Sequence, residues 1–169
     1  PKAVPEILFV CVHNAGRSQM AAAIAEHLAP GRVHVRSAGS APTREINPQA
    51  VSVLAERGID LTTAYPKPLT DTVLHAADII VTMGCGDSCP IFPGKQYLDW
   101  DVADPDGATL DEVRDIRDDL TRSRGPEHLD AVDRSRTRRT TAHHRAGTPI
   151  PRGNPGSSGC HSRPTTHAP

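Results

Sequence analysis

A cysteine, an arginine and a serine stand close together near the start of this 169-residue chain, in the order Cys-x5-Arg-Ser. Cys11 offers a thiol that becomes a nucleophile once it loses its proton. Arg17 presents a planar guanidinium that can bind two oxygens of an anion at once, and Ser18 can donate a hydrogen bond to a thiolate. These residue types at this spacing favour attack of Cys11 on the central atom of a tetrahedral oxyanion.

The flanking segments would place this motif at the N-terminus of a helix. Residues 7–12 form a continuous apolar run typical of a strand covered on both faces, and apolar residues recur at helical spacing at Met20, Ile24 and Leu28. The loop between them would aim its N–H groups at one point, where the positive end of the helix dipole favours an anion or a thiolate. We therefore predict an oxyanion-binding loop composed of Val12, His13, Asn14, Ala15, Gly16, Arg17 and Ser18.

The competing interpretation of the motif is structural. Free cysteines are often small core residues, so Cys11 could be buried at a strand end with Arg17 on a helix surface. The joint occurrence of strand, cysteine, arginine, serine and helix favours the functional loop. His13 either contacts the oxyanion or, as we prefer, fills the loop, and Asn14 can brace the loop through side-chain hydrogen bonds.

Strands alternate with helices along the rest of the N-terminal part. In chain order we predict a strand from Val33, a helix from Asn47-Pro48 to Gly58, a short helix at 71–77, strands at 78–83 and 96–100, and a helix from Thr109 to Leu120. Right-handed crossovers then give an α/β fold with a four-stranded parallel sheet. Cys11, Cys85 and Asp104 all follow strands, so we expect them at one edge of the sheet.

Residues 11–21, Cys-Val-His-Asn-Ala-Gly-Arg-Ser-Gln-Met-Ala, resemble the low-molecular-weight tyrosine phosphatase superfamily, and within it the arsenate reductases, particularly the mycothiol-dependent enzymes. Phosphatases of the superfamily more often carry Gly in place of His13 and Cys in place of Gly16. The resemblance covers about residues 6–120. It implies a three-layer sandwich in one domain at residues 1–120, with a cysteine nucleophile and an oxyanion-binding arginine in the loop.

The segment from Trp100 to Pro105 resembles the acid loop of the superfamily, in which the aspartate before the proline, here Asp104, protonates the leaving group. A departing oxygen needs a proton, and a carboxyl group can supply it. The competing interpretation is a plain turn, because Asp-Pro-Asp-Gly is common turn chemistry. Three other carboxylates compete for the acid role, namely Asp99, Asp101 and Asp106.

Cys85 and Cys89 indicate redox chemistry, because a second thiol can reduce a thiol–arsenate adduct to As(III). The resemblance leaves two routes open. In thioredoxin-coupled reductases a cysteine pair in this region shuttles a disulfide, although with a longer spacing. In the mycothiol-dependent branch, a small thiol attacks the adduct instead. Residues 83–87, Met-Gly-Cys-Gly-Asp, resemble the sequence of that branch. We expect no metal, because no second cysteine or histidine pair stands nearby at the spacing of zinc ligands.

Residues 121–169 differ in composition from the rest. Residues 1–120 hold 10 Lys and Arg against 17 Asp and Glu, a net charge of −7, whereas residues 121–169 hold 9 Arg against 3 acidic residues, a net charge of +6. With few large apolar residues, this basic, low-complexity C-terminal tail is predicted to be disordered. It is a solvated appendage, a nucleic-acid-binding arm or an out-of-frame read of a GC-rich gene. Nucleic-acid binding is disfavoured, because no aromatic residue interleaves the arginines.

The function we prefer is reduction of arsenate to arsenite, with Cys11 attacking arsenic, Arg17 holding the oxyanion and Asp104 protonating the leaving hydroxide. The resemblance implies no bound cofactor, mycothiol or another small thiol as co-substrate, and a mycoredoxin or glutaredoxin-like protein as partner. One alternative is a thioredoxin-coupled reductase that uses Cys85 and Cys89. Another is a low-molecular-weight protein tyrosine phosphatase, which the aromatic content of 3% disfavours.

A non-enzymatic thiol sensor that binds arsenite is the remaining alternative, but it gives no reason for Arg17 and Asp104. No apolar run approaches the ~20 residues needed to span a bilayer, and no signal segment opens the chain. We therefore expect a cytoplasmic protein without membrane contact, and a monomer.

Overall fold

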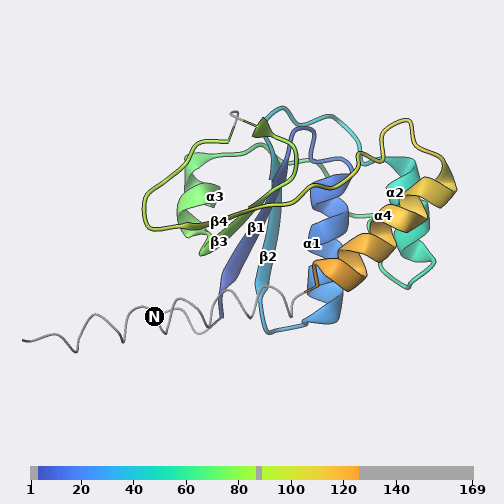
Figure 1. Cartoon of the computed structure of the whole chain (residues 1–169), viewed down its shortest axis with the longest axis horizontal. Coiled ribbons are helices and arrows are strands. Elements are labelled where there is room, and N and C mark those ends of the chain that lie inside the picture. The colour runs from blue at the N-terminus through green and yellow to red at the C-terminus, as the bar shows by residue number, and fades with distance from the viewer. Residues whose placement is uncertain (1–3, 87–88, 126–169) are drawn as a thin grey trace, which may run out of the picture. The chain divides into compact units, whose positions relative to one another are not determined.

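A computed structural model of the chain describes residues 4–86 and 89–125, and its centre is a parallel β-sheet (Figure 1). The sheet has four strands in the order β2-β1-β3-β4, and every neighbouring pair is parallel. The strands are β1 (Glu6–Cys11), β2 (His34–Gly39), β3 (Ile79–Thr82) and β4 (Gln96–Asp99). The predicted four-stranded parallel sheet is confirmed.

β1 is the strand against which both outer layers pack. All six of its residues are buried, and alternate side chains point to opposite faces of the sheet. Ile7, Phe9 and Cys11 belong to the core on one face, and Leu8 and Val10 belong to the core on the other. The apolar run is continuous because a strand covered on both faces has no polar side.

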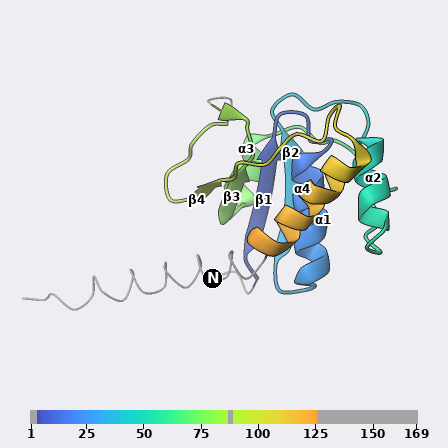
Figure 2. The same cartoon turned by 45° about the vertical axis from the view of Figure 1, so that its right-hand side comes forward.

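Helices cover both faces of the sheet (Figures 1 and 2). They are α1 (Arg17–Leu28), α2 (Pro48–Ala55), α3 (Asp71–Ala76) and α4 (Leu110–Ser123). Buried side chains of α1, α2 and α4 pack with Phe9, whereas Leu74 of α3 packs with Val10 on the opposite face. The architecture is the three-layer sandwich that the sequence predicted.

The helix starts follow the capping signals in the sequence. The side chain of Asn47 accepts hydrogen bonds from two N–H groups in the first turn of α2. Thr109 and Glu112 form a capping box at the start of α4. The apolar spacing in the sequence extends to Leu28, but this residue lies at the end of α1 and is 41% exposed.

Ion pairs connect α4 to the residue that follows α2. The carboxylate of Glu56 accepts hydrogen bonds from Nη2 of Arg114 at 2.7 Å and from Nη1 of Arg117 at 2.8 Å. Because both arginines favour its charged form, the pKa of Glu56 is lowered from 4.5 to about 2. The carboxylate of Glu56 therefore binds a proton more weakly in the folded protein than in the unfolded chain.

This pKa shift predicts a pH dependence of stability in acid. The stabilisation by charged Glu56 is fully present above about pH 4.5 and is lost as the pH falls toward 2. The side chain is 37% exposed, so solvent screening keeps the effect small. In Glu56→Gln, the urea denaturation midpoint should depend less on pH across this range than in the wild type. Glu26→Gln, which removes an exposed carboxylate of α1, should retain the wild-type dependence; equal curves for all three proteins would contradict the prediction.

Helix α4 continues past the boundary predicted at residue 120 and ends at Ser123. Residues 126–169, which make up most of the predicted tail, lie outside the described residues. The division into a domain at 1–120 and a tail at 121–169 therefore stays a prediction. No helix in the described part is long and apolar enough to cross a membrane.

Candidate active site

Cys11 lies at the carboxyl end of β1, at the position where the chain leaves the sheet for the predicted oxyanion loop. The residue is 2% exposed. Its Sγ lies 2.9 Å from Oγ of Ser18 and accepts a hydrogen bond from the backbone N–H of Asn14 at 3.3 Å. Two polar hydrogens can therefore stabilise negative charge on this sulfur.

Asn14 fixes which way the Ser18 hydroxyl points. Its side chain is fully buried, and its backbone has φ = 50°, a left-handed conformation that asparagine tolerates better than most residues. Nδ2 of Asn14 donates to Oγ of Ser18 at 2.7 Å. Because Ser18 accepts that bond, its own hydrogen is free to point at Cys11 Sγ. The bracing role predicted for Asn14 matches this arrangement.

Gln19 supports Asn14 in turn, and sequence reasoning missed it. Nε2 of Gln19 donates to Oδ1 of Asn14 at 2.9 Å and to the carbonyl oxygen of Tyr65 at 3.0 Å. The backbone N–H of Lys67 also donates to Oδ1 of Asn14, at 2.8 Å. A chain of hydrogen bonds thus runs from the loop at Tyr65 through Gln19, Asn14 and Ser18 to the sulfur of Cys11.

Replacing Gln19 tests this chain of hydrogen bonds. In Gln19→Leu, Asn14 loses one of its two partners at Oδ1, so we expect slower alkylation of Cys11 by iodoacetamide at pH 7. Loss of one buried hydrogen bond corresponds to a decrease of roughly two- to fivefold in the rate constant. Gln49→Leu on α2 is the matched control and should alkylate at the wild-type rate. A folded Gln19→Leu variant with unchanged alkylation would show that Gln19 does not support the thiolate.

The N-terminus of α1 is open toward this loop. Within the described ranges, α1 alone among the four helices has no side-chain cap, and its first turn carries no acidic residue. The loop also packs tightly against the end of β2. A Cβ atom at Gly39 would lie 2.6 Å from the carbonyl oxygen of Val12, so only glycine fits there. These features leave the first N–H groups of α1 available to an oxyanion.

A cleft of about 490 Å³ opens in front of the loop. It is lined by Cys11, His13, Ala15, Gly16, Arg17, Thr43, Arg44, Glu45, Ile46, Asn47, Pro48, Asp104, Pro105 and Asp106. His13 is exposed and lines the cleft, so of its two predicted roles the structure favours contact with an oxyanion. Asn14 and Ser18 are buried behind the loop, and Val12 does not line the cleft. Any contact of these three residues with an oxyanion would have to come from their backbone N–H groups.

Asp104 is next to the oxyanion loop. Its Oδ2 forms an ion pair with Nη2 of Arg17 at 2.8 Å, and its Oδ1 accepts a hydrogen bond from the N–H of Asp106 at 3.1 Å. Asp104 is 44% exposed and the Arg17 side chain 13%. Of the competing carboxylates, Asp99 bonds to Thr82 instead, at 2.7 Å. An oxyanion at Arg17 would thus meet Asp104 directly.

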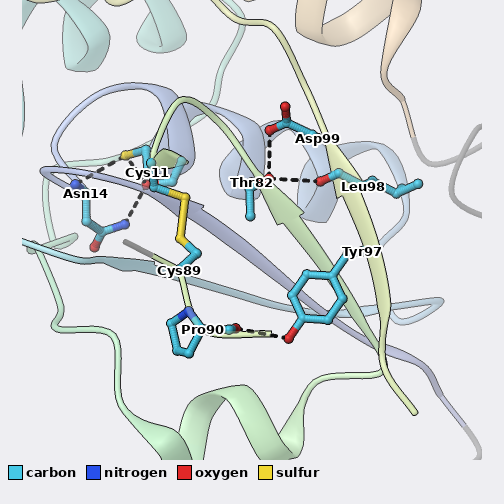
Figure 3. The surroundings of a disulfide bond; sticks show 10 residues. Cys11, Asn14, Thr82, Cys89, Pro90, Tyr97, Leu98 and Asp99 are labelled. Carbon is cyan, nitrogen blue, oxygen red and sulfur yellow. Dashed lines mark hydrogen bonds between the residues drawn. A yellow bond between two sulfur atoms is a disulfide. The ribbon is translucent and has the colours of Figure 1, made fainter. Parts of the chain in front are cut away.

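Cys85 and Cys89 form a disulfide, with their Cα atoms 6.2 Å apart (Figure 3). Cys85 is 5% exposed, whereas Cys89 is only partly buried. Figure 3 draws Cys11 among the residues that surround this bond. The turn at Gly84, next to Cys85, also packs against the oxyanion loop. A Cβ atom at Gly84 would lie 2.5 Å from Nη1 of Arg17. The structure therefore brings the redox pair and the oxyanion loop together.

The disulfide excludes these two sulfurs as zinc ligands in this state, because a metal binds the thiolate. Across the described residues, no group of three or more His, Cys, Asp or Glu side chains is placed to hold a metal ion.

The fold and the loop between β1 and α1 define a protein of the phosphotyrosine phosphatase type. Residues 6–137 match the family model described as low molecular weight phosphotyrosine protein phosphatase, and the chain belongs to this family. The resemblance found in the sequence is confirmed.

Relatives within the family are named as arsenate reductases. A putative arsenate reductase of Halobacterium salinarum is 38% identical over 117 residues, which cover 66% of this chain and 82% of that protein. A glutaredoxin arsenate reductase of Synechocystis is 33% identical over 115 residues, which cover 66% of this chain and 87% of that protein. The solved structure of a thioredoxin-dependent arsenate reductase of Corynebacterium glutamicum is 46% identical, with a TM-score of 0.65, over 78% of this chain and 63% of that one. This chain thus spans less than two thirds of the Corynebacterium protein.

Proposed function

We propose that this protein is a thiol-dependent arsenate reductase. The observation that carries the proposal is the free thiol of Cys11, hydrogen-bonded to Ser18 in an oxyanion loop, beside a disulfide between Cys85 and Cys89. A hydrolytic phosphatase needs the loop but not the cysteine pair. The names of the relatives support the same conclusion.

In the first step, the Cys11 thiolate attacks arsenic and forms a sulfur–arsenic bond. Arg17 and the N–H groups at the start of α1 hold the oxygens of arsenate and stabilise the charge that develops on them. Asp104 gives a proton to the departing hydroxide, which leaves as water. Asp104 pairs with the guanidinium of Arg17 in the structure, so the incoming oxyanion has to displace the Asp104 carboxylate from it.

In the second step, the arsenic gains two electrons. The Cys85 thiolate attacks Sγ of Cys11, the sulfur–arsenic bond breaks, and its electron pair leaves with arsenic as arsenite. A disulfide between Cys11 and Cys85 remains. Cys89 then attacks Cys85, which frees the Cys11 thiolate and produces the bond between Cys85 and Cys89 that the structure contains.

The reductant that reopens this disulfide is a dithiol protein of the thioredoxin type in our proposal. Cys89 is the more exposed of the two residues, and the thioredoxin-dependent relative is 46% identical. The predicted coupling to mycothiol and a mycoredoxin stays an alternative, in which the small thiol attacks the arsenate adduct and the cysteine pair is auxiliary. Either cycle needs a reducing compartment, in line with the predicted cytoplasmic location.

Arsenite production by the purified protein tests the proposal. Arsenate is supplied with thioredoxin and its reductase, with mycothiol and mycoredoxin, or with no thiol system. We expect turnover with thioredoxin and its loss in Cys89→Ser. Turnover with mycothiol alone, unaffected by Cys89→Ser, would favour the small-thiol route. If no arsenite forms under any condition and the protein hydrolyses an aryl phosphate fast in a reaction that needs Cys11, the protein is a phosphatase and the proposal is wrong.

A further inference from the structure

Three segments of the chain meet at Asn47, the residue that caps α2. Its backbone N–H donates to the carbonyl oxygen of Ala15 in the oxyanion loop at 2.9 Å. Its side-chain Nδ2 donates to the carbonyl oxygen of Pro105 in the acid loop at 3.3 Å. One residue therefore contacts both the loop that binds the oxyanion and the loop that carries the proton donor.

The orientation of the Asn47 amide is fixed by the helix that it caps. Oδ1 accepts hydrogen bonds from the N–H groups of Gln49 and Ala50 at 2.9 and 3.2 Å. An N–H group cannot take the place of that oxygen, so Nδ2 has to face Pro105. The start of α2 thus determines where the donor for the acid loop points.

Pro105 also packs directly on the oxyanion loop. A Cβ atom at Gly16 would overlap Cγ of Pro105, so the proline ring occupies the space that a side chain at position 16 would take. Asp104 precedes this proline and reaches Arg17. The position of the carboxylate therefore depends on Pro105 staying seated between Gly16 and Asn47.

We propose that Asn47 is a positioning residue for the proton transfer, because its side-chain amide holds Pro105, and with it Asp104, over the oxyanion loop. This inference rests on the proposed function, in which Asp104 protonates the leaving oxygen. Asn47 lines the cleft, but the hydrogen bonds of its side chain go to Pro105 and to the first turn of α2. It acts on the step in which the leaving group departs and not on the nucleophile, because no bond links its side chain to Cys11, Ser18 or Asn14 in the described part of the chain.

Two substitutions separate the helix cap from the hydrogen bond between Asn47 and Pro105, which we call the clamp. Serine and aspartate both cap helices well, so Asn47→Ser and Asn47→Asp keep the start of α2 but lose the donor to Pro105. We expect kcat for arsenite production to fall about tenfold in both, because a displaced proton donor loses much of its effect. In Asn47→Ser, the KM for arsenate and the alkylation rate of Cys11 should stay within about twofold of the wild type, whereas Asn47→Asp also adds a negative charge to the cleft and should raise the KM. Wild-type kcat in both variants, or parallel changes in KM and alkylation in Asn47→Ser, would overturn the proposal.

The rate of amide hydrogen exchange at Asp106 tests the clamp without measuring enzyme activity. The N–H of Asp106 donates to Asp104, so its exchange should become faster in Asn47→Ser. Ser52→Ala, on the exposed side of α2, is the control and should exchange like the wild type. If the wild type makes no arsenite, the proposed function fails, but faster exchange at Asp106 still supports the clamp. Unchanged exchange at Asp106 overturns the clamp whatever the activity.

Discussion

Cys11→Ser should abolish arsenite production, with a rate reduced by roughly 10⁴-fold or more. A serine hydroxyl stays protonated at neutral pH and is a poor nucleophile. Even if it formed an ester with arsenate, its oxygen could not accept the attack of Cys85 and become part of a disulfide. Serine is also close to cysteine in size and can still bond to Ser18, so the fold should survive the change.

The measurement is arsenite production in the presence of the thioredoxin system, with thermal denaturation to verify folding. Cys160→Ser provides the matched control, because it removes a thiol that our mechanism does not use. A Cys11→Ser variant that keeps even a tenth of the wild-type rate would rule out Cys11 as the nucleophile.

Arg17→Lys should lower kcat/KM for arsenate by roughly 10²- to 10³-fold. Lysine keeps the positive charge but loses the planar fork that binds two oxygens. In the wild type the guanidinium is held between Asp104, which pairs with Nη2, and the turn at Gly84, which lies against Nη1. An ammonium group cannot fill both positions at once.

Steady-state kinetics with arsenate, and competition by inorganic phosphate, measure this loss. The control is Arg36→Lys, since Arg36 is 56% exposed and pairs with Glu6. It should behave like the wild type. If Arg17→Lys changed kcat/KM no more than Arg36→Lys does, the oxyanion would have to bind elsewhere.

The sequence was sufficient for the parts of the site that are local in the chain. Cys11, Arg17 and Ser18 lie within eight residues, and strand and helix patterns flank them directly. The cap at Asn47 was also predictable, because capping depends on the next three residues. Such features are set by short-range sterics and hydrogen bonding, which leave a clear pattern in sequence.

Contacts between distant segments had no comparable signal. Gln19 bonds to Tyr65, which is 46 residues away, and Asn47 bonds to Pro105, which is 58 residues away. Neither pair follows from residue type or periodicity. Whether Cys85 and Cys89 form a disulfide also depends on backbone geometry that their spacing does not specify.

The most direct test of the account is a single turnover by fully reduced protein, with arsenate and no external thiol. The chain has four cysteines. We expect close to one arsenite per chain, a fall in free thiols from four to two, and a disulfide between Cys85 and Cys89 in peptide mass spectra. Cys89→Ser should also release one arsenite but stop with Cys11 bonded to Cys85. If no arsenite forms and all four thiols remain, the protein does not reduce arsenate through its own cysteines.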